Sequence, residues 1–402
     1  MTSGQDEFDP AAVVALTSAL VRLRTVHESE AADVETPAAE LLARTMRGFG
    51  WDVTVTEVSP GRPNVVAQVR GARPGLTLMF EGHLDVVTEA DPDLWSFDPY
   101  SGEVVDGRLR GRGSADMKSG VAAMVHAARA VQLGGFDGRI VLGALADEEG
   151  MMLGAKYCAG EVRAGVWGVV DGVIVCEPEG GEVCPAAKGA IRLQVELIGA
   201  MAHGAMPQMG RNPVPAICSL LVGLDQIQQA IRAQTGTHPL LGEFSLTPTV
   251  LRAGSHDQLN VIPATATLAL DIRTIPGVDH RMLIELVTRL ADTLAAESGL
   301  HARITVIDDR PSVDTPVDSP VVEAMFAGHQ AATGRPAVLG GVPGTTDGTI
   351  LTRDAGLPTV VYGPGGKWIA HQADEYVEVE DIVISTRAYI AAARYFLANP
   401  HG

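Results

Sequence analysis

The chain has 402 residues, of which 46% are hydrophobic and 20% are charged, and its formal net charge is −19. This composition is typical of a soluble globular protein long enough for two domains. The acidic balance argues against nucleic-acid and anionic-membrane partners, because both need a basic face. The four cysteines form no C-x-x-C pair, and the acidic N-terminus has no leader-like apolar region, so we expect a cytoplasmic protein.

The first part of the chain alternates predicted helices and strands. Asp9-Pro10 and Thr36-Pro37 are typical helix starts, and apolar residues follow each at helical spacing. A third helix is predicted from Met117 to Leu133. Short apolar runs predict strands over residues 51–58, 64–69, 76–80, 139–145 and 172–176. This order predicts an α/β fold with a mixed, mostly parallel sheet and helices on both faces.

The pattern changes near Lys188-Gly189. Beyond it, the predicted order is β-α-β-β-α-β, which is the ferredoxin-like arrangement. The strands are predicted over 190–198, 244–252, 265–273 and 302–308, and the helices from 212 and over 279–297. We therefore expect an α+β domain over 189–308, inserted into a larger domain made of 1–188 and 309–402. The larger fold resumes with a helix at 319–333, a strand at 359–362 and a helix at 380–397.

Histidines and carboxylates follow the predicted strands of the larger domain. The candidates are His83, Asp85, Asp116, Glu148, Glu149, Glu177 and His371. Ligands of open α/β sheets collect beyond the carboxyl ends of the strands, so we expect these side chains to converge. Taken singly, Asp116 is better interpreted as a helix N-cap, and Glu148-Glu149 as a solvated turn.

The convergence of these residues favours a site for two metal ions. Adjacent carboxylates repel each other in a cleft unless a cation neutralises them. One acid of the Glu148-Glu149 pair can then bind metal while the other takes a proton from a water molecule. Asp85 would hold the second ring nitrogen of a metal-bound His83.

The chain resembles the co-catalytic zinc amidohydrolases and metallopeptidases. This family includes acetylornithine deacetylase, succinyl-diaminopimelate desuccinylase, aminoacylase and the glutamate carboxypeptidases. The matching stretches are Phe80–Val87, Gly111–Gly120, Ala146–Gly150, Gly199–Gly204, Asn260–Pro263, Asp271–Arg273 and Tyr362–Gly365. They follow the family's order and cover nearly the whole chain.

The resemblance implies a role for each candidate. Asp116 would bridge two zinc ions, for which cobalt or manganese are alternatives. His83 and Glu177 would complete the ligands of one ion, and Glu149 and His371 those of the other. The remaining implied roles are general base for Glu148, support for Asp85, oxyanion stabilisation for His203, and binding of the substrate's carboxylate for Asn260 and Arg273. A cis peptide is implied between Asp116 and Met117.

The implied reaction is cleavage of the amide bond of an N-acyl amino acid by a water molecule that bridges the metals. The inserted domain would act as a lid and as the interface of a homodimer. A dipeptidase or carboxypeptidase with the same mechanism is the nearest alternative, and the substrate is in each case a small molecule or short peptide. A non-catalytic binding protein on this fold is a more remote alternative, because the base and all five ligands are present.

Overall fold

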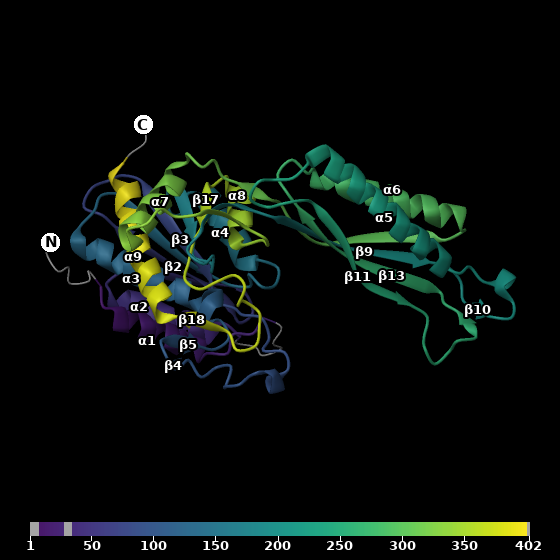
Figure 1. Ribbon diagram of the computed structural model, residues 1–402, viewed down its shortest axis with the longest axis horizontal. Helices are drawn as coiled ribbons and strands as arrows, with labels where there is room; N and C mark the ends of the chain where they lie inside the picture. Colours follow the sequence, from purple (N-terminus) through teal and green to yellow (C-terminus); the bar gives the residue numbers. More distant parts are fainter. Residues whose placement is uncertain (1–7, 28–33, 400–402) are drawn as a thin grey trace. The chain divides into compact units, whose positions relative to one another are not determined.

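The computed structural model describes residues 8–27 and 34–399. It divides into two compact units (Figure 1). The first unit contains the described residues up to Ala186, together with Asp314–Val342 and the chain from Thr346 onward. The second unit is Ala187–Val313 with Pro343–Thr345. The predicted insert over 189–308 lies within the second unit, which also includes residues outside that range.

A nine-stranded sheet forms the centre of the first unit. Its strand order is β1 (Asp52–Ser59), β2 (Arg62–Arg70), β6 (Arg139–Leu145), β3 (Thr77–His83), β7 (Gly172–Val175), β17 (Thr359–Val361), β8 (Val183–Ala187) and β15 (Val313–Asp314), with β16 (Leu339–Val342) beside β8. The central strands β6, β3, β7 and β17 are parallel, whereas β1, β2 and β8 pair antiparallel with their neighbours. The prediction of a mixed, mostly parallel sheet is confirmed.

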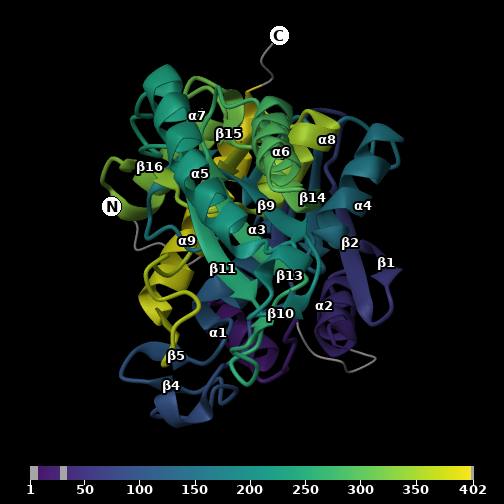
Figure 2. The ribbon, with the colours of Figure 1, turned by 90° about the vertical axis from the view of Figure 1, so that its right-hand side faces the viewer.

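Helices cover both faces of this sheet (Figures 1 and 2). One face carries α1 (Pro10–Val21), α2 (Thr36–Gly48), α3 (Ser119–Gly134), α7 (Pro320–Thr333) and α9 (Val379–Ala398), and the other carries α4 (Leu153–Arg163) and α8 (Asp347–Ala355). Successive residues of β3 are therefore all buried. Leu78 and Phe80 pack into the core under α3 and α9, while Met79 points to the opposite face.

The start of α3 differs from the prediction. The sequence predicts a helix from Met117, but α3 begins at Ser119. Asp116 and Met117 have non-helical backbone angles, and the peptide bond between them is cis, as the family resemblance implies. The helical spacing of apolar residues is continuous through this segment, so periodicity alone does not reveal the break.

The second unit has the ferredoxin-like arrangement. Its chain order is β9 (Gly189–Ile198), α5 (Val214–Thr235), β11 (Ser245–Ala253), β13 (Thr265–Thr274), α6 (His280–Glu297) and β14 (His301–Arg310), and its antiparallel sheet has the order β11-β13-β9-β14. Figure 2 shows α5 and α6 side by side over one face of this sheet. Strand β10 (Ala202–His203) follows β9 in the chain, and β12 (Val261–Ile262) precedes β13. These two short strands pair antiparallel in a separate two-stranded sheet.

Helix α5 is long and apolar enough to cross a membrane by length and composition alone. Its buried residues Ile217, Leu220 and Leu224 pack into the core of the second unit. A core helix of a globular domain has the same properties, so this helix is explained by its packing on the sheet.

Candidate metal centre

The carboxylate of Asp116 lies between two histidine side chains. Its Oδ1 is 3.1 Å from Nε2 of His83, and its Oδ2 is 3.2 Å from Nε2 of His371. His83 ends β3 and is buried, whereas His371 lies on the loop after β17 with 52% of its side chain exposed. No side chain caps α3. The structure therefore favours the bridging position of Asp116 over the helix-cap interpretation.

Two groups of three potential ligands share Asp116. Glu177, just after β7, has an oxygen 3.5 Å from Nε2 of His83. Glu149, on the loop after β6, has an oxygen 2.9 Å from Nε2 of His371. In each group, one ligand atom per residue lies within 4.8 Å of the others. The five predicted ligands are thus brought together at the carboxyl ends of the central strands.

The chemistry of these side chains fits a pair of divalent cations. Carboxylate and imidazole ligands suit zinc, cobalt and manganese. In the chain alone, burial and the charge of Asp116 raise the pKa of Glu177 to about 8. Hydrogen bonds with Asp116 and Glu149 raise the pKa of His371 to about 11. Both groups therefore retain protons that balance excess negative charge, and bound cations would take over that role.

Asp85 holds the loop that carries Glu148 and Glu149. One carboxylate oxygen of Asp85 accepts a hydrogen bond from the backbone N–H of Glu148 at 3.0 Å, and the other accepts one from Glu149 at 3.1 Å. Nδ1 of His83 lies 2.9 Å from the backbone oxygen of Asp85 but 3.5 Å from its carboxylate. The backbone of Asp85 thus supports His83, while its side chain orders the loop of the predicted base.

Glu148 is buried beside the predicted ligands. It forms a third group with His83 and Glu149, again with atoms within 4.8 Å. Burial raises the pKa of the Glu148 carboxyl well above its usual value. A buried carboxyl group beside the predicted ligands is placed to exchange a proton with a water molecule bound among them.

A buried ion pair between Arg112 and Glu375 lies next to Asp116, and the sequence patterns do not indicate it. The carboxylate of Glu375 accepts hydrogen bonds from the backbone N–H groups of Ala115 at 2.9 Å and Asp116 at 3.1 Å. Its other oxygen is 2.5 Å from Nη1 of Arg112, and both side chains are almost fully buried. Glu375 therefore fixes the backbone from which Asp116 projects. The only sequence signal for it is its position four residues after His371.

The three remaining candidates, His203, Asn260 and Arg273, lie in the second unit. His203 and Asn260 are close to each other there. His203 is exposed on β10, pairs with Val261, and is followed by Gly204, whose N–H donates to the backbone oxygen of Asn260 at 2.6 Å. Arg273 lies on β13 and pairs through two nitrogens with Asp271, at 2.6 and 3.1 Å. The guanidinium fork of Arg273 thus already holds a carboxylate.

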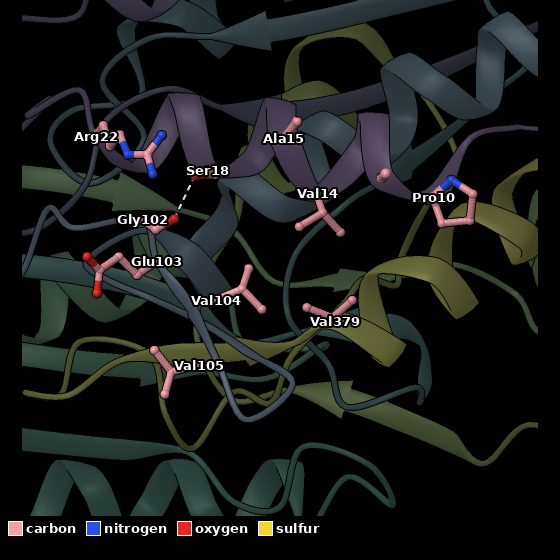
Figure 3. Close-up of a pocket in the computed structure, with 11 residues that line it drawn as sticks. Pro10, Val14, Ala15, Ser18, Arg22, Gly102, Glu103, Val104, Val105 and Val379 are labelled. Carbon is pink, nitrogen blue, oxygen red and sulfur yellow. Dashed lines mark hydrogen bonds between the residues drawn. The ribbon is translucent and has the colours of Figure 1, made fainter.

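A cavity elsewhere in the first unit is separate from these residues. It has a volume of about 620 Å³ and lies between α1, Val379 and β4 (Val104–Val105), the strand that pairs with β5 (Arg108–Arg110) (Figure 3). Its walls are mostly apolar, with Arg22 and Glu103 at the rim. None of the predicted site residues lines it, so this cavity is not part of the candidate metal centre.

The chain is similar to proteins of a known family. The profile of Peptidase family M20/M25/M40 matches residues 79–395. The succinyl-diaminopimelate desuccinylase of Cereibacter sphaeroides is 31% identical over 96% of this chain and 99% of its own length.

Solved structures share the fold. An M20 family metallo-carboxypeptidase from Sulfolobus solfataricus matches with a TM-score of 0.80 and 17% identity, over 98% of this chain and all of the other. A dinuclear metal-binding peptidase of the M20 family from Bacillus subtilis matches with a TM-score of 0.71 and 17% identity, over 97% of this chain and 99% of the other.

Proposed function

The chain belongs to peptidase family M20/M25/M40 and is a hydrolase of amide bonds, and from that premise we propose that it is a two-zinc deacylase of N-acyl amino acids. The observation that carries this proposal is the carboxylate of Asp116, whose two oxygens each face a different histidine. This is the arrangement that a ligand shared by two ions requires. The likeness to a desuccinylase favours an acidic acyl group such as succinyl.

The ligands divide into two sets. His83, Asp116 and Glu177 would hold one ion, and Asp116, Glu149 and His371 the other. Bound there, the two ions would supply Lewis acidity that polarises an amide carbonyl and makes a water molecule more acidic.

The chain's own residues then move the proton. A carboxylate oxygen of Glu148 takes the proton from the attacking water and delivers it to the nitrogen of the leaving amine. The hydrogen bonds that Asp85 accepts from the backbone N–H groups of Glu148 and Glu149 hold the loop that carries this carboxylate during both transfers.

We extend the proposal to a homodimer formed through the second unit. β11 is an edge strand whose residues are largely exposed, so its free edge can pair with another copy. Arg273 and Thr265, at the two ends of β13, are about 26 Å apart at the usual rise per residue. His203 lies near the Thr265 end of β13. Thr265 pairs with Ile198, and His203 follows Ile198 by five residues in the chain. One small substrate cannot reach both Arg273 and His203 of the same chain, which supports a site completed by a partner subunit.

The decisive experiment is a substrate panel with the zinc-loaded protein. It compares N-succinyl, N-acetyl and N-aroyl amino acids with a few dipeptides, and follows release of the free amino acid. We expect turnover of N-acyl amino acids, with N-succinyl substrates first. Cleavage of dipeptides alone would favour the dipeptidase alternative. Full metal loading without any hydrolysis would point to a binding protein. The cytoplasmic location stays a prediction.

A further inference from the structure

Lys367 joins two loops that carry predicted ligands of different metal ions. Its Nζ lies 2.8 Å from Oε2 of Glu179 and 2.9 Å from Oε2 of Glu182. The two glutamates belong to the β7–β8 loop, which also contains Glu177. Lys367 belongs to the loop after β17, four residues before His371. We call Lys367, Glu179 and Glu182 the loop clamp.

The backbones of the same two loops also touch. The N–H of Gly180 donates to the oxygen of Gly365 at 2.8 Å. A Cβ atom on Gly363 would lie 2.4 Å from the backbone oxygen of Cys176 and 2.5 Å from that of Glu177. The close approach therefore requires glycine at position 363. The loop clamp thus acts on two segments that lie against each other.

The charges of the clamp make it more than a surface contact. Only 3% of the Glu179 side chain and 29% of the Lys367 side chain are exposed. Glu179, Glu182 and Cys184 also form a group whose ligand atoms lie within 4.8 Å, and the Lys367 ammonium is the cation beside them. Loss of that ammonium would leave a buried carboxylate without its counter-charge and would remove the ionic contact between the two loops.

His371 is the predicted ligand that depends most on its loop. His83 is fixed because it belongs to β3. The backbone N–H of Asp116 donates a hydrogen bond to Glu375, and the backbone N–H of Glu149 donates one to Asp85, so both of these ligands are also held. His371 is half exposed, and apart from its contacts within the centre its loop is held on either side, by Lys367 four residues before it and by Glu375 four residues after it.

We propose that Lys367 is a positioning residue that holds the His371 loop against the Glu177 loop and so sets the affinity for the second metal ion. The inference rests on the proposed two-metal centre. Lys367 itself is not one of the proposed ligands. Its effect passes through His371, which belongs to the Asp116–Glu149–His371 set.

The test measures metal binding rather than turnover. Metal-free full-length protein is titrated with Co²⁺, followed by calorimetry and by the visible spectrum of the bound ion. We expect two ions in the wild-type chain. In Lys367→Gln, the affinity for one ion should fall about 10- to 100-fold, the usual effect of losing support behind a ligand. The affinity for the other ion should stay unchanged, and Lys367→Arg should keep most of the wild-type affinity for both ions.

Two further variants sharpen the test. Lys156→Gln, in α4, removes a lysine away from the clamp and should match wild type. In a Glu179→Gln/Glu182→Gln background, adding Lys367→Gln should change the second affinity little, because the clamp is already lost.

Several outcomes would overturn the inference. Both affinities within twofold of wild type in Lys367→Gln would do so, and so would an equal loss of both ions. A wild-type chain that binds fewer than two ions would overturn the two-metal function and this inference with it. A two-ion wild type with an unchanged variant would overturn the inference alone.

Discussion

At the residue scale, Glu148 carries the proposed proton transfer and leads to the first prediction. Glu148→Gln keeps the size of the side chain but cannot take a proton from water. We expect kcat to fall by about 10²- to 10⁴-fold. The metal content, measured by elemental analysis, should stay unchanged, because the proposed ligands are intact. Glu40→Gln, on the exposed side of α2, is the matched control. Activity of Glu148→Gln within tenfold of wild type would exclude this residue as the base.

The buried pair of Glu375 and Arg112 gives a prediction about stability. Glu375→Ala leaves the guanidinium of Arg112 buried without a partner, which costs about 3–5 kcal/mol of unfolding free energy. The matched control is Glu378→Ala. It removes an exposed partner of Arg108 at a similar distance of 2.8 Å and should cost less than about 1 kcal/mol. Urea unfolding of the metal-free proteins measures both values. Equal costs for the two variants would contradict the interpretation of Glu375 as an internal support.

At the element scale, the contact between the loops after β7 and β17 depends on Gly363. Gly363→Ala places a Cβ against two backbone oxygens, which cannot move aside as a side chain would. We expect a loss of about 1–3 kcal/mol in stability, together with faster loss of metal to a chelator. Gly160→Ala, on α4, meets no atom within 4 Å. It should be neutral or stabilising by up to about 1 kcal/mol, because alanine is the better helix former.

The predicted helices and strands are those that a pattern in nearby sequence indicates, and the unpredicted ones lack such a pattern. Asp9 accepts a hydrogen bond from the N–H of Ala11 and starts α1 where the sequence predicts. The short helices α4 and α8 were not predicted, since both contain glycine and neither has a long apolar stripe. In the three-stranded sheet, β4 and β5 form a local hairpin around Asp106-Gly107, whereas β18 (Tyr376–Glu378) pairs with β5 from a distant part of the chain, which no local pattern indicates.

The same contrast holds for the site. The convergence of the five proposed ligands and Glu148 could be predicted because most of them lie near the end of a strand or the start of a helix, and parallel strands bring such ends together. Glu375 lies 260 residues from Ala115 in sequence, and Lys367 lies 188 residues from Glu179. Nothing in their local sequence distinguishes either residue from an ordinary surface charge, so their roles emerge only from the folded chain.

At the scale of the whole molecule, the proposed dimer predicts complementation. His203→Ala alone should lower kcat by about 10²- to 10³-fold if this side chain stabilises the oxyanion. Refolding it together with Glu148→Ala should restore up to about one quarter of wild-type activity, because half of randomly formed dimers are mixed and each has one intact site. Steady-state rates and native mass spectrometry measure the outcome. No recovery in a verified mixed dimer would place His203 within its own subunit or outside the reaction.

Metal removal predicts a change in thermal stability. All five proposed ligands lie in the first unit. Two ions bound to the folded chain should stabilise it by mass action, and their removal by a chelator should lower Tm by roughly 5–10 °C. Scanning calorimetry with and without chelator, followed by re-addition of Zn²⁺, measures the shift. An unchanged Tm in protein verified to have lost its metal would mean that the cluster is not coupled to folding.

The way in which the second unit is inserted has an evolutionary consequence. It begins with β9 and ends with β14, and Ala190 and Arg310 are cross-strand neighbours, so its two ends are adjacent. The strands on either side of it, β8 and β15, are neighbours in the large sheet, and Thr315 donates a hydrogen bond to Pro185. A gene can therefore acquire, exchange or lose the intervening cassette without reordering the strands that present the metal ligands. Under the proposed function, such an exchange would change the side chains that the second unit offers to a substrate and would leave the proposed metal ligands in place.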